Sequence, residues 1–141
     1  MIFEFSQWVV DIDVEKTREF YNNASFVSEV CPCSGCRNYE KAIDFLPDEV
    51  ISFFSRLGIE MKKIREVYVN YANADNTVYY GGFYHVCGKI ISGENKGFSV
   101  AKDFTVLFQS DCYLLEDNFP VPAIQIEILT NIPWVLNEDN S

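Results

Sequence analysis

Three cysteines within six residues form the segment with the clearest chemical potential. Cys31, Cys33 and Cys36 stand in the run Cys31-Pro32-Cys33-Ser34-Gly35-Cys36, just before a region expected to be helical. Thiolates gathered this closely repel one another unless a cation compensates them, and a C-x-x-C turn presents two sulfurs to one ion. The spacing therefore predicts a site for one structural zinc ion and for no other cofactor.

A tetrahedral zinc site needs a fourth ligand, and two candidates lie much later in the chain. His85 and Cys87 are two residues apart, so they share one face of an expected strand. Either side chain completes the site if that strand lies beside the start of the helix. The predicted metal ligands are therefore Cys31, Cys33 and Cys36 with His85 or Cys87.

Two other interpretations of the cysteine segment stay open. Cys33 and Cys36 are spaced like a redox pair, and a following helix lowers the pKa of such thiols. A thioredoxin-type pair, however, follows a buried strand, and the residues before Cys31 do not have that pattern. In the second interpretation the thiols are small buried hydrophobic groups, and Pro32 and Gly35 shape a turn.

Catalytic patterns are weak, and we expect no enzyme. His85 is the only histidine, and Cys87, two residues further along the same expected strand, is poorly placed to act with it as nucleophile and base. The pair Gly81-Gly82 lacks the lysine that follows a phosphate-binding loop. A bulge or a close backbone approach explains these glycines better.

The periodicity of apolar residues predicts one α+β domain over residues 1–136, with a disordered tail at 137–141. The clearest helix follows Pro47, where Val50, Phe54 and Leu57 form an apolar stripe that Gly58 ends. The expected helices are 14–22, 38–45 and 47–57, and the expected strands are 2–10, 65–72, 77–91, 98–109 and 122–130. The order β-α-α-α-β-β-β-β favours two layers, a mainly antiparallel sheet covered by helices from the N-terminal half.

Charge and aromatic content favour a protein partner. The net charge of −10 argues against nucleic acid, which needs clustered Lys and Arg. Successive residues of a strand point to opposite faces, so the aromatic run at 79–84 is expected to place some rings on the surface. The predicted contact residues for a basic protein partner are Tyr79, Tyr80, Phe83, Tyr84, Glu116 and Asp117.

The start of the chain carries no secretory or membrane signal. Met1 to Phe5 contain no basic segment followed by a long apolar run, and no stretch approaches the ~20 apolar residues of a membrane span. A cytoplasmic location without membrane contact is expected. Five cysteines in a cytosolic chain then favour thiols or metal ligands over structural disulfides.

Four segments together resemble a family of small uncharacterised bacterial proteins. They are Cys31 to Asn38, Leu46-Pro47 with Leu57-Gly58-Ile59, Tyr80 to Gly88, and Ile132-Pro133-Trp134-Val135-Leu136. A short acidic α+β chain is also similar in style to the immunity proteins that neutralise bacterial toxins. That resemblance implies a binding module that blocks a basic toxin, and the alternative is a zinc-stabilised domain with another role or, less favoured, a small thiol-dependent enzyme.

Overall fold

A seven-stranded antiparallel sheet forms one layer of the protein. The computed structural model describes residues 1–138. The strands follow the order β1-β2-β4-β7-β6-β5, and β3 pairs with the half of β4 that β2 leaves free. Their bounds are β1 (Ile2–Phe5), β2 (Trp8–Ile12), β3 (Glu66–Ala72), β4 (Thr77–Ser92), β5 (Phe98–Ala101), β6 (Phe104–Gln109) and β7 (Ala123–Pro133).

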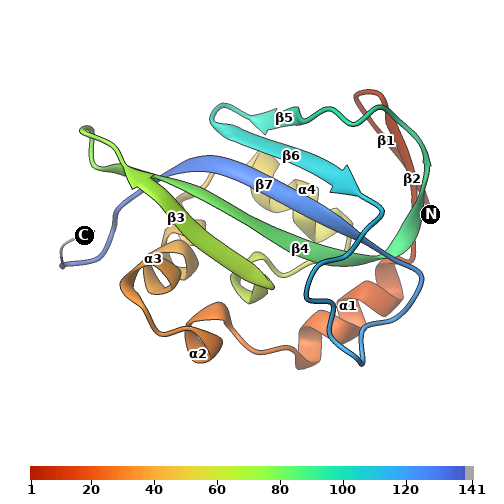
Figure 1. Ribbon diagram of the computed structural model, residues 1–141, viewed down its shortest axis with the longest axis horizontal. Coiled ribbons are helices and arrows are strands. Elements are labelled where there is room, and N and C mark those ends of the chain that lie inside the picture. Colours follow the sequence, from red (N-terminus) through yellow and green to blue (C-terminus); the bar gives the residue numbers. More distant parts are fainter. Residues whose placement is uncertain (139–141) are drawn as a thin grey trace.

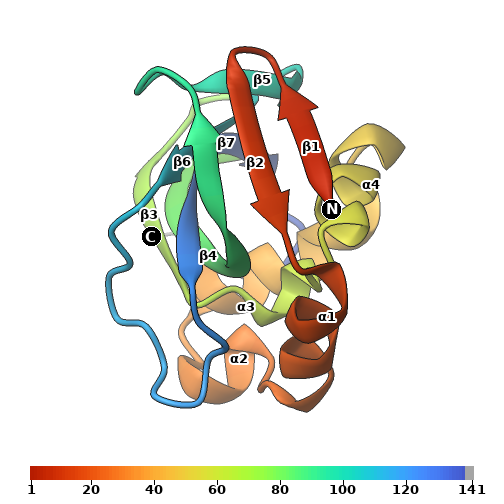
Figure 2. The same ribbon diagram turned by 90° about the vertical axis from the view of Figure 1, so that its right-hand side faces the viewer.

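Helices cover one side of this sheet, as Figures 1 and 2 show. They are α1 (Val14–Asn23), α2 (Val27–Val30), α3 (Ser34–Ala42) and α4 (Asp48–Arg56), with 3-10 turns at Ile43–Phe45 and Met61–Lys63. The predicted two-layer α+β fold is confirmed. Among the described residues, no helix has the length and apolar character needed to cross a membrane.

The sheet curves so that its two outer strands, β1 and β5, approach each other. The ring of Phe5 in β1 stacks on Phe98 in β5 with centroids 6.1 Å apart. Nearby, the indole Nε1 of Trp8 donates to the carbonyl of Lys96 at 2.9 Å. Helix α4 lies against this curved sheet, because Phe53 contacts both Phe5 and Phe98.

Helix α4 forms where the sequence predicts it. Pro47 is its N-cap, and the acidic Asp48 in the first turn complements the helix dipole. Its buried stripe includes Phe54, whose ring contacts Tyr84 of β4. Gly58 follows the helix with φ +89°, and a Cβ there would lie 2.5 Å from the carbonyl of Val14, so glycine is required at this close approach.

Two segments predicted as single strands are hairpins. The segment 2–10 turns at Ser6, which has φ 55°, and forms β1 and β2. The segment 98–109 turns at Asp103, with φ 63°, and forms β5 and β6. In both cases the apolar alternation continues across a polar two-residue turn, so periodicity alone hides the reversal.

The helix predicted at 38–45 begins earlier, and one short helix was not predicted. Helix α3 starts at Ser34 with Cys33 as its N-cap, and Asn38 is buried inside it rather than capping it. Helix α2 has four residues, too few for a periodic pattern. Of the tail predicted to be disordered, residues 139–141 lie outside the described residues, and the Glu138 carboxylate forms an ion pair with Arg37.

Candidate metal centre

The sulfurs of Cys31, Cys33 and Cys36 come together where α2 ends and α3 begins. All three Sγ atoms lie within 4.8 Å of one another, and the Sγ atoms of Cys31 and Cys33 are 3.3 Å apart. All three cysteines are free thiols. The structure therefore places three soft ligands close enough to hold one metal ion, and this is the clearest candidate site in the described part of the chain.

Local backbone structure gathers these sulfurs. Cys31 is the C-cap of α2, and its N–H donates to the carbonyl of Val27 at 2.9 Å. After the extended Pro32, Cys33 takes the N-cap position of α3 and Cys36 falls in the first helical turn. An N-cap side chain folds over the third residue of its helix, so the spacing Cys33-x-x-Cys36 turns both sulfurs to the same point.

Buried polar contacts fix this turn against the sheet. The Tyr80 hydroxyl, from β4, donates to the carbonyl of Gly35 at 2.7 Å. The buried Asn38 amide donates to the Tyr80 hydroxyl and to the carbonyl of Pro133, and its Oδ1 accepts from the N–H of Val135. Helix α3 is thus held by β4 and by the end of β7, which fixes the backbone that carries Cys33 and Cys36.

The surroundings shift the pKa values of the Cys33 and Cys36 thiols in opposite directions. Burial acts to raise the pKa of Cys33, but the backbone N–H of Cys36, the thiols of Cys31 and Cys36 and the N–H of Gly35 outweigh it and lower that pKa. Burial raises the pKa of Cys36 well above its ordinary value, and the neighbouring thiols raise it further. The Cys33 thiol therefore loses its proton more readily than the Cys36 thiol, and a cation held by all three sulfurs must displace the proton of Cys36.

His85 does not join the three sulfurs. Side chains alternate along β4, and His85 points to the side opposite Tyr80 and Tyr84, which contact α3 and the turn before β3. Its ring packs against Phe119, and its Nε2 lies 3.1 Å from Oε1 of Gln125. Burial lowers the pKa of His85. The predicted role of His85 as fourth ligand therefore has no support in the geometry.

Cys87 is also placed away from the three sulfurs. Its backbone N–H donates to Oγ1 of Thr17, and its carbonyl accepts from the N–H of Asp13, so this part of β4 borders the start of α1. Burial, followed by the charge of Asp13, raises the pKa of the Cys87 thiol. In the described residues the ligand group contains Cys31, Cys33 and Cys36 alone, without Cys87.

Most of the aromatic residues predicted to contact a partner are buried. Tyr80 and Tyr84 face the helices and are fully buried, and burial raises the pKa of Tyr80 to about 12. Phe83 is buried on the opposite side of the sheet, where the ring of Tyr113 packs edge-on against it. Tyr79 alone of these four is half-exposed.

Exposed aromatic surface comes instead from residues that the sequence prediction missed. Tyr68 and Tyr71 of β3 and Tyr113 of the loop before β7 are exposed. They lie on the side of the sheet away from the helices, because Tyr68 covers Gly81 and Tyr71 packs on Tyr79. The alternation within 65–72 indicated one outward face, but nothing in the sequence showed that this strand lies at an edge.

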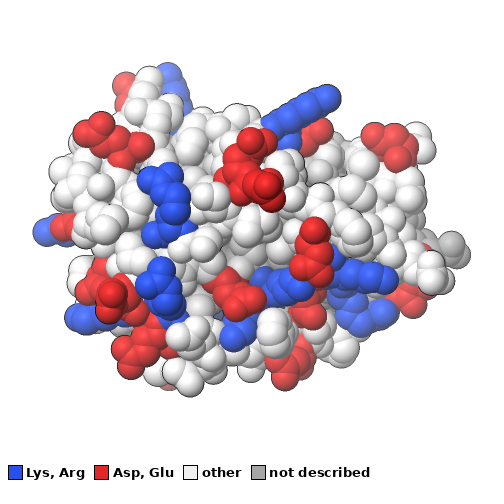
Figure 3. Space-filling model, turned by 180° about the vertical axis from the view of Figure 1, so that it is seen from behind, with Lys and Arg blue, Asp and Glu red and all other residues white. Residues whose placement is uncertain are grey.

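Charged residues are distributed without a large patch of one sign on the helix side, where acidic and basic side chains intermingle (Figure 3). Glu116 and Asp117, both predicted as contact residues, are exposed in the loop that follows β6. This loop borders the side of the sheet that carries Tyr113. The loop therefore carries exposed acidic and aromatic side chains, and its exposed aromatic residue, Tyr113, is not one of those predicted.

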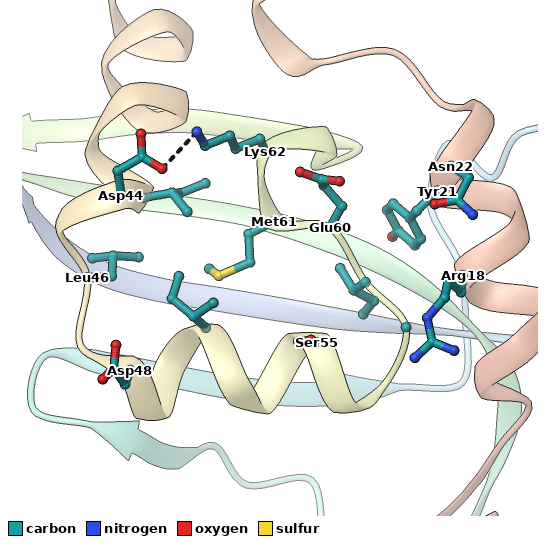
Figure 4. A pocket seen from close by; sticks show the side chains of 14 residues that line it. Arg18, Tyr21, Asn22, Asp44, Leu46, Asp48, Ser55, Glu60, Met61 and Lys62 are labelled. Atoms are coloured by element: carbon teal, nitrogen blue, oxygen red, sulfur yellow. Dashed lines mark ion pairs between the residues drawn. The ribbon is translucent and has the colours of Figure 1, made fainter.

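A pocket of about 580 Å³ lies between α1 and α4 (Figure 4). Its floor includes Ile59 and Met61, and its rim carries Arg18 on one side and the Lys62–Asp44 ion pair, at 2.8 Å, on the other. The charged groups stand around the rim and do not converge on one point. The pocket therefore lacks the close grouping of reactive atoms found at the three cysteines.

Comparisons with known proteins identify no family for this chain. No protein-family model, no curated protein and no solved structure matches the chain. The resemblance to small bacterial cysteine-containing proteins stays a prediction, as does the similarity to immunity proteins. The three-cysteine cluster is then the observation from which a function is argued.

Proposed function

We propose that this protein binds one zinc ion through Cys31, Cys33 and Cys36. The observation that carries the proposal is the convergence of three free Sγ atoms within 4.8 Å. Zinc–sulfur bonds of about 2.3 Å set neighbouring sulfurs of a tetrahedral site about 3.8 Å apart. The sulfurs need to move by no more than about 1 Å to reach that geometry, which is a side-chain adjustment.

The ion has a structural role in this proposal. Cys36 is buried under β3, with its Sγ 4.0 Å from the carbonyl of Val67, whereas Cys33 is exposed. A bound ion therefore joins the connection between α2 and α3 to the first turn of α3, which packs against β3. In the described residues no fourth Cys, His, Asp or Glu joins the group, so water or a ligand from outside this set completes the coordination.

Zinc titration of the reduced, metal-free protein tests the proposal. One equivalent is expected to bind per chain, with release of protons, because Cys36 holds its proton until the ion arrives. The measurement is competition with a chromophoric chelator, combined with proton release in weakly buffered solution. Absence of saturable binding, or binding without proton release, contradicts the proposed site.

A second candidate function is that of an immunity-type module that neutralises a basic bacterial toxin. The observation that favours it is the exposed Tyr113 beside the exposed acidic residues Glu116 and Asp117. Exposed tyrosines and charge of one sign are features of protein-binding surfaces, and opposite charge on the partner speeds association. Half-exposed Tyr79 extends this surface along β4.

Growth rescue tests this second function. Co-expression of the chain is expected to protect a bacterium from a basic toxin domain encoded beside its gene. The double change Glu116→Lys and Asp117→Lys is expected to weaken protection, because both side chains are exposed and contribute charge rather than packing. Failure to protect against every such neighbouring toxin domain contradicts this function.

A further inference from the structure

Strand β3 is the sheet edge that the described residues leave open. It pairs with β4 on one side and with no strand on the other. The two other edges, β1 and β5, meet through the Phe5–Phe98 stack and the contact of Trp8 with the Lys96 carbonyl. In Figure 1, β3 runs along the border of the sheet, with α3 next to it and lower in the view. Of the described edge strands, β3 is therefore the one that faces no other edge of the sheet.

The composition of β3 is unusual for an unprotected edge. From Val67 to Ala74 the chain carries no charge and no proline. Tyr68, Val69 and Tyr71 are 50%, 40% and 55% exposed. Natural edge strands are commonly blunted by lysine, proline, shortness or a bulge, because an open apolar edge is a template for another strand. Of these devices β3 has only a bulge, between Val69 and Tyr71. Six of the seven residues of β3 are uncharged, and two of them are exposed tyrosines, which favours strand addition.

We propose that β3 pairs antiparallel with β3 of a second copy of this chain, joining two sheets into one. A two-fold axis between Val69 and Asn70 sets Tyr68 opposite Tyr71 of the second copy, and Val67 opposite Ala72 of that copy. The bulge between Val69 and Tyr71 shifts the alternation of β3, so Tyr68 and Tyr71 project from the same side of the sheet, as their contacts with Gly81 and Tyr79 show. Two cross-strand tyrosine pairs then stabilise the junction.

Charge supports a second copy as the occupant. Each chain has a net charge of −10, so two copies repel over most of their surfaces and can meet where charge is absent. The uncharged stretch has Arg65 near its start and Asp75 just after its end. Antiparallel pairing brings Arg65 of each copy near Asp75 of the other, so the junction contains two such pairs of opposite charge. The same register sets Glu66 opposite the neutral Asn73. The charges along this edge are therefore self-complementary.

Sedimentation of the full chain in reducing buffer tests this pairing. The wild-type protein is expected to shift from monomer to dimer as its concentration rises from about 5 to about 500 µM, because the interface is small. Tyr71→Lys is expected to raise the dissociation constant at least tenfold, by placing charge where two aromatic rings meet. Tyr113→Lys is the matched control, since Tyr113 is exposed but lies outside β3, and it is expected to leave the dissociation constant unchanged.

Hydrogen exchange gives a second measurement that needs no variant. Amide exchange over Tyr68–Ala72 is expected to slow as the wild-type concentration rises, while exchange in the exposed loop at 111–118 stays constant. A wild-type protein that remains monomeric at the highest concentration overturns the proposal. So does a dimer that Tyr71→Lys and Tyr113→Lys weaken equally, or one whose β3 amides exchange at a rate independent of concentration. Cys36 of the metal site lies against the carbonyl of Val67 in β3, so both measurements use reduced, metal-free protein, which tests the pairing separately from zinc binding.

Discussion

Phe54→Ala is expected to lower the free energy of unfolding by about 3 to 5 kcal/mol. Phe54 is fully buried in the last turn of α4, and its ring contacts Phe53, Tyr84 and Phe104. Truncation removes contacts with β4 and β6 at once and leaves a cavity between rigid elements. The surrounding rings belong to strands that are fixed by their neighbours, so collapse into the cavity is limited.

Urea unfolding, followed by far-UV circular dichroism, measures this loss. Phe45→Ala is the matched control, because Phe45 is 67% exposed in the 3-10 turn just before α4. Its truncation is expected to cost about 0.5 kcal/mol or less. A loss below about 1 kcal/mol for Phe54→Ala, or equal losses for both variants, means that α4 buries a different face.

Cys36→Ser is expected to abolish the stabilisation that zinc confers. A ligand present at about 1,000 times its dissociation constant stabilises the folded state by about 4 kcal/mol. For a chain of this size that corresponds to a rise in melting temperature of roughly 10 °C. A hydroxyl is a poor zinc ligand in proteins, so the variant should lose both the ion and the rise.

The comparison is the difference in melting temperature with and without zinc, because Cys36 is buried and its replacement also affects the metal-free protein. Cys112→Ser is the control: Cys112 is half-buried, and it is not one of the three grouped cysteines. This variant should keep the full rise. A zinc-dependent rise retained by Cys36→Ser, or lost in Cys112→Ser, assigns the ion to other ligands.

The fold could be predicted where the spacing of apolar residues is regular over a whole helix or strand. The stripe of α4 and the length of β4 follow from periodicity alone, and the alternation in β7 placed Ile124, Ile126 and Ile128 on the buried side. Hairpin turns at Ser6 and Asp103 were missed, because a reversal over two residues leaves the alternating pattern intact. Helix α2 was missed because four residues carry no period.

The candidate site could be predicted where its ligands are neighbours in the sequence. Cys31, Cys33 and Cys36 lie on one turn, so their spacing decides their geometry. The fourth ligand depended on which side of β4 faces α3, and both sides of that strand are apolar and buried around Tyr84 and His85. With no polar face to mark the outside, the sequence could not show that His85 points away from α3 and binds Gln125 instead.

X-ray absorption at the zinc edge tests the metal site most directly, since it counts the ligands around the ion. For zinc-loaded protein, three sulfur neighbours at about 2.3 Å and one oxygen or nitrogen at about 2.0 to 2.1 Å are expected. The stoichiometry should be one zinc per chain, and Cys36→Ser should lose the sulfur shell. A spectrum with fewer than two sulfur neighbours, or with oxygen and nitrogen ligands alone, contradicts a site built from Cys31, Cys33 and Cys36.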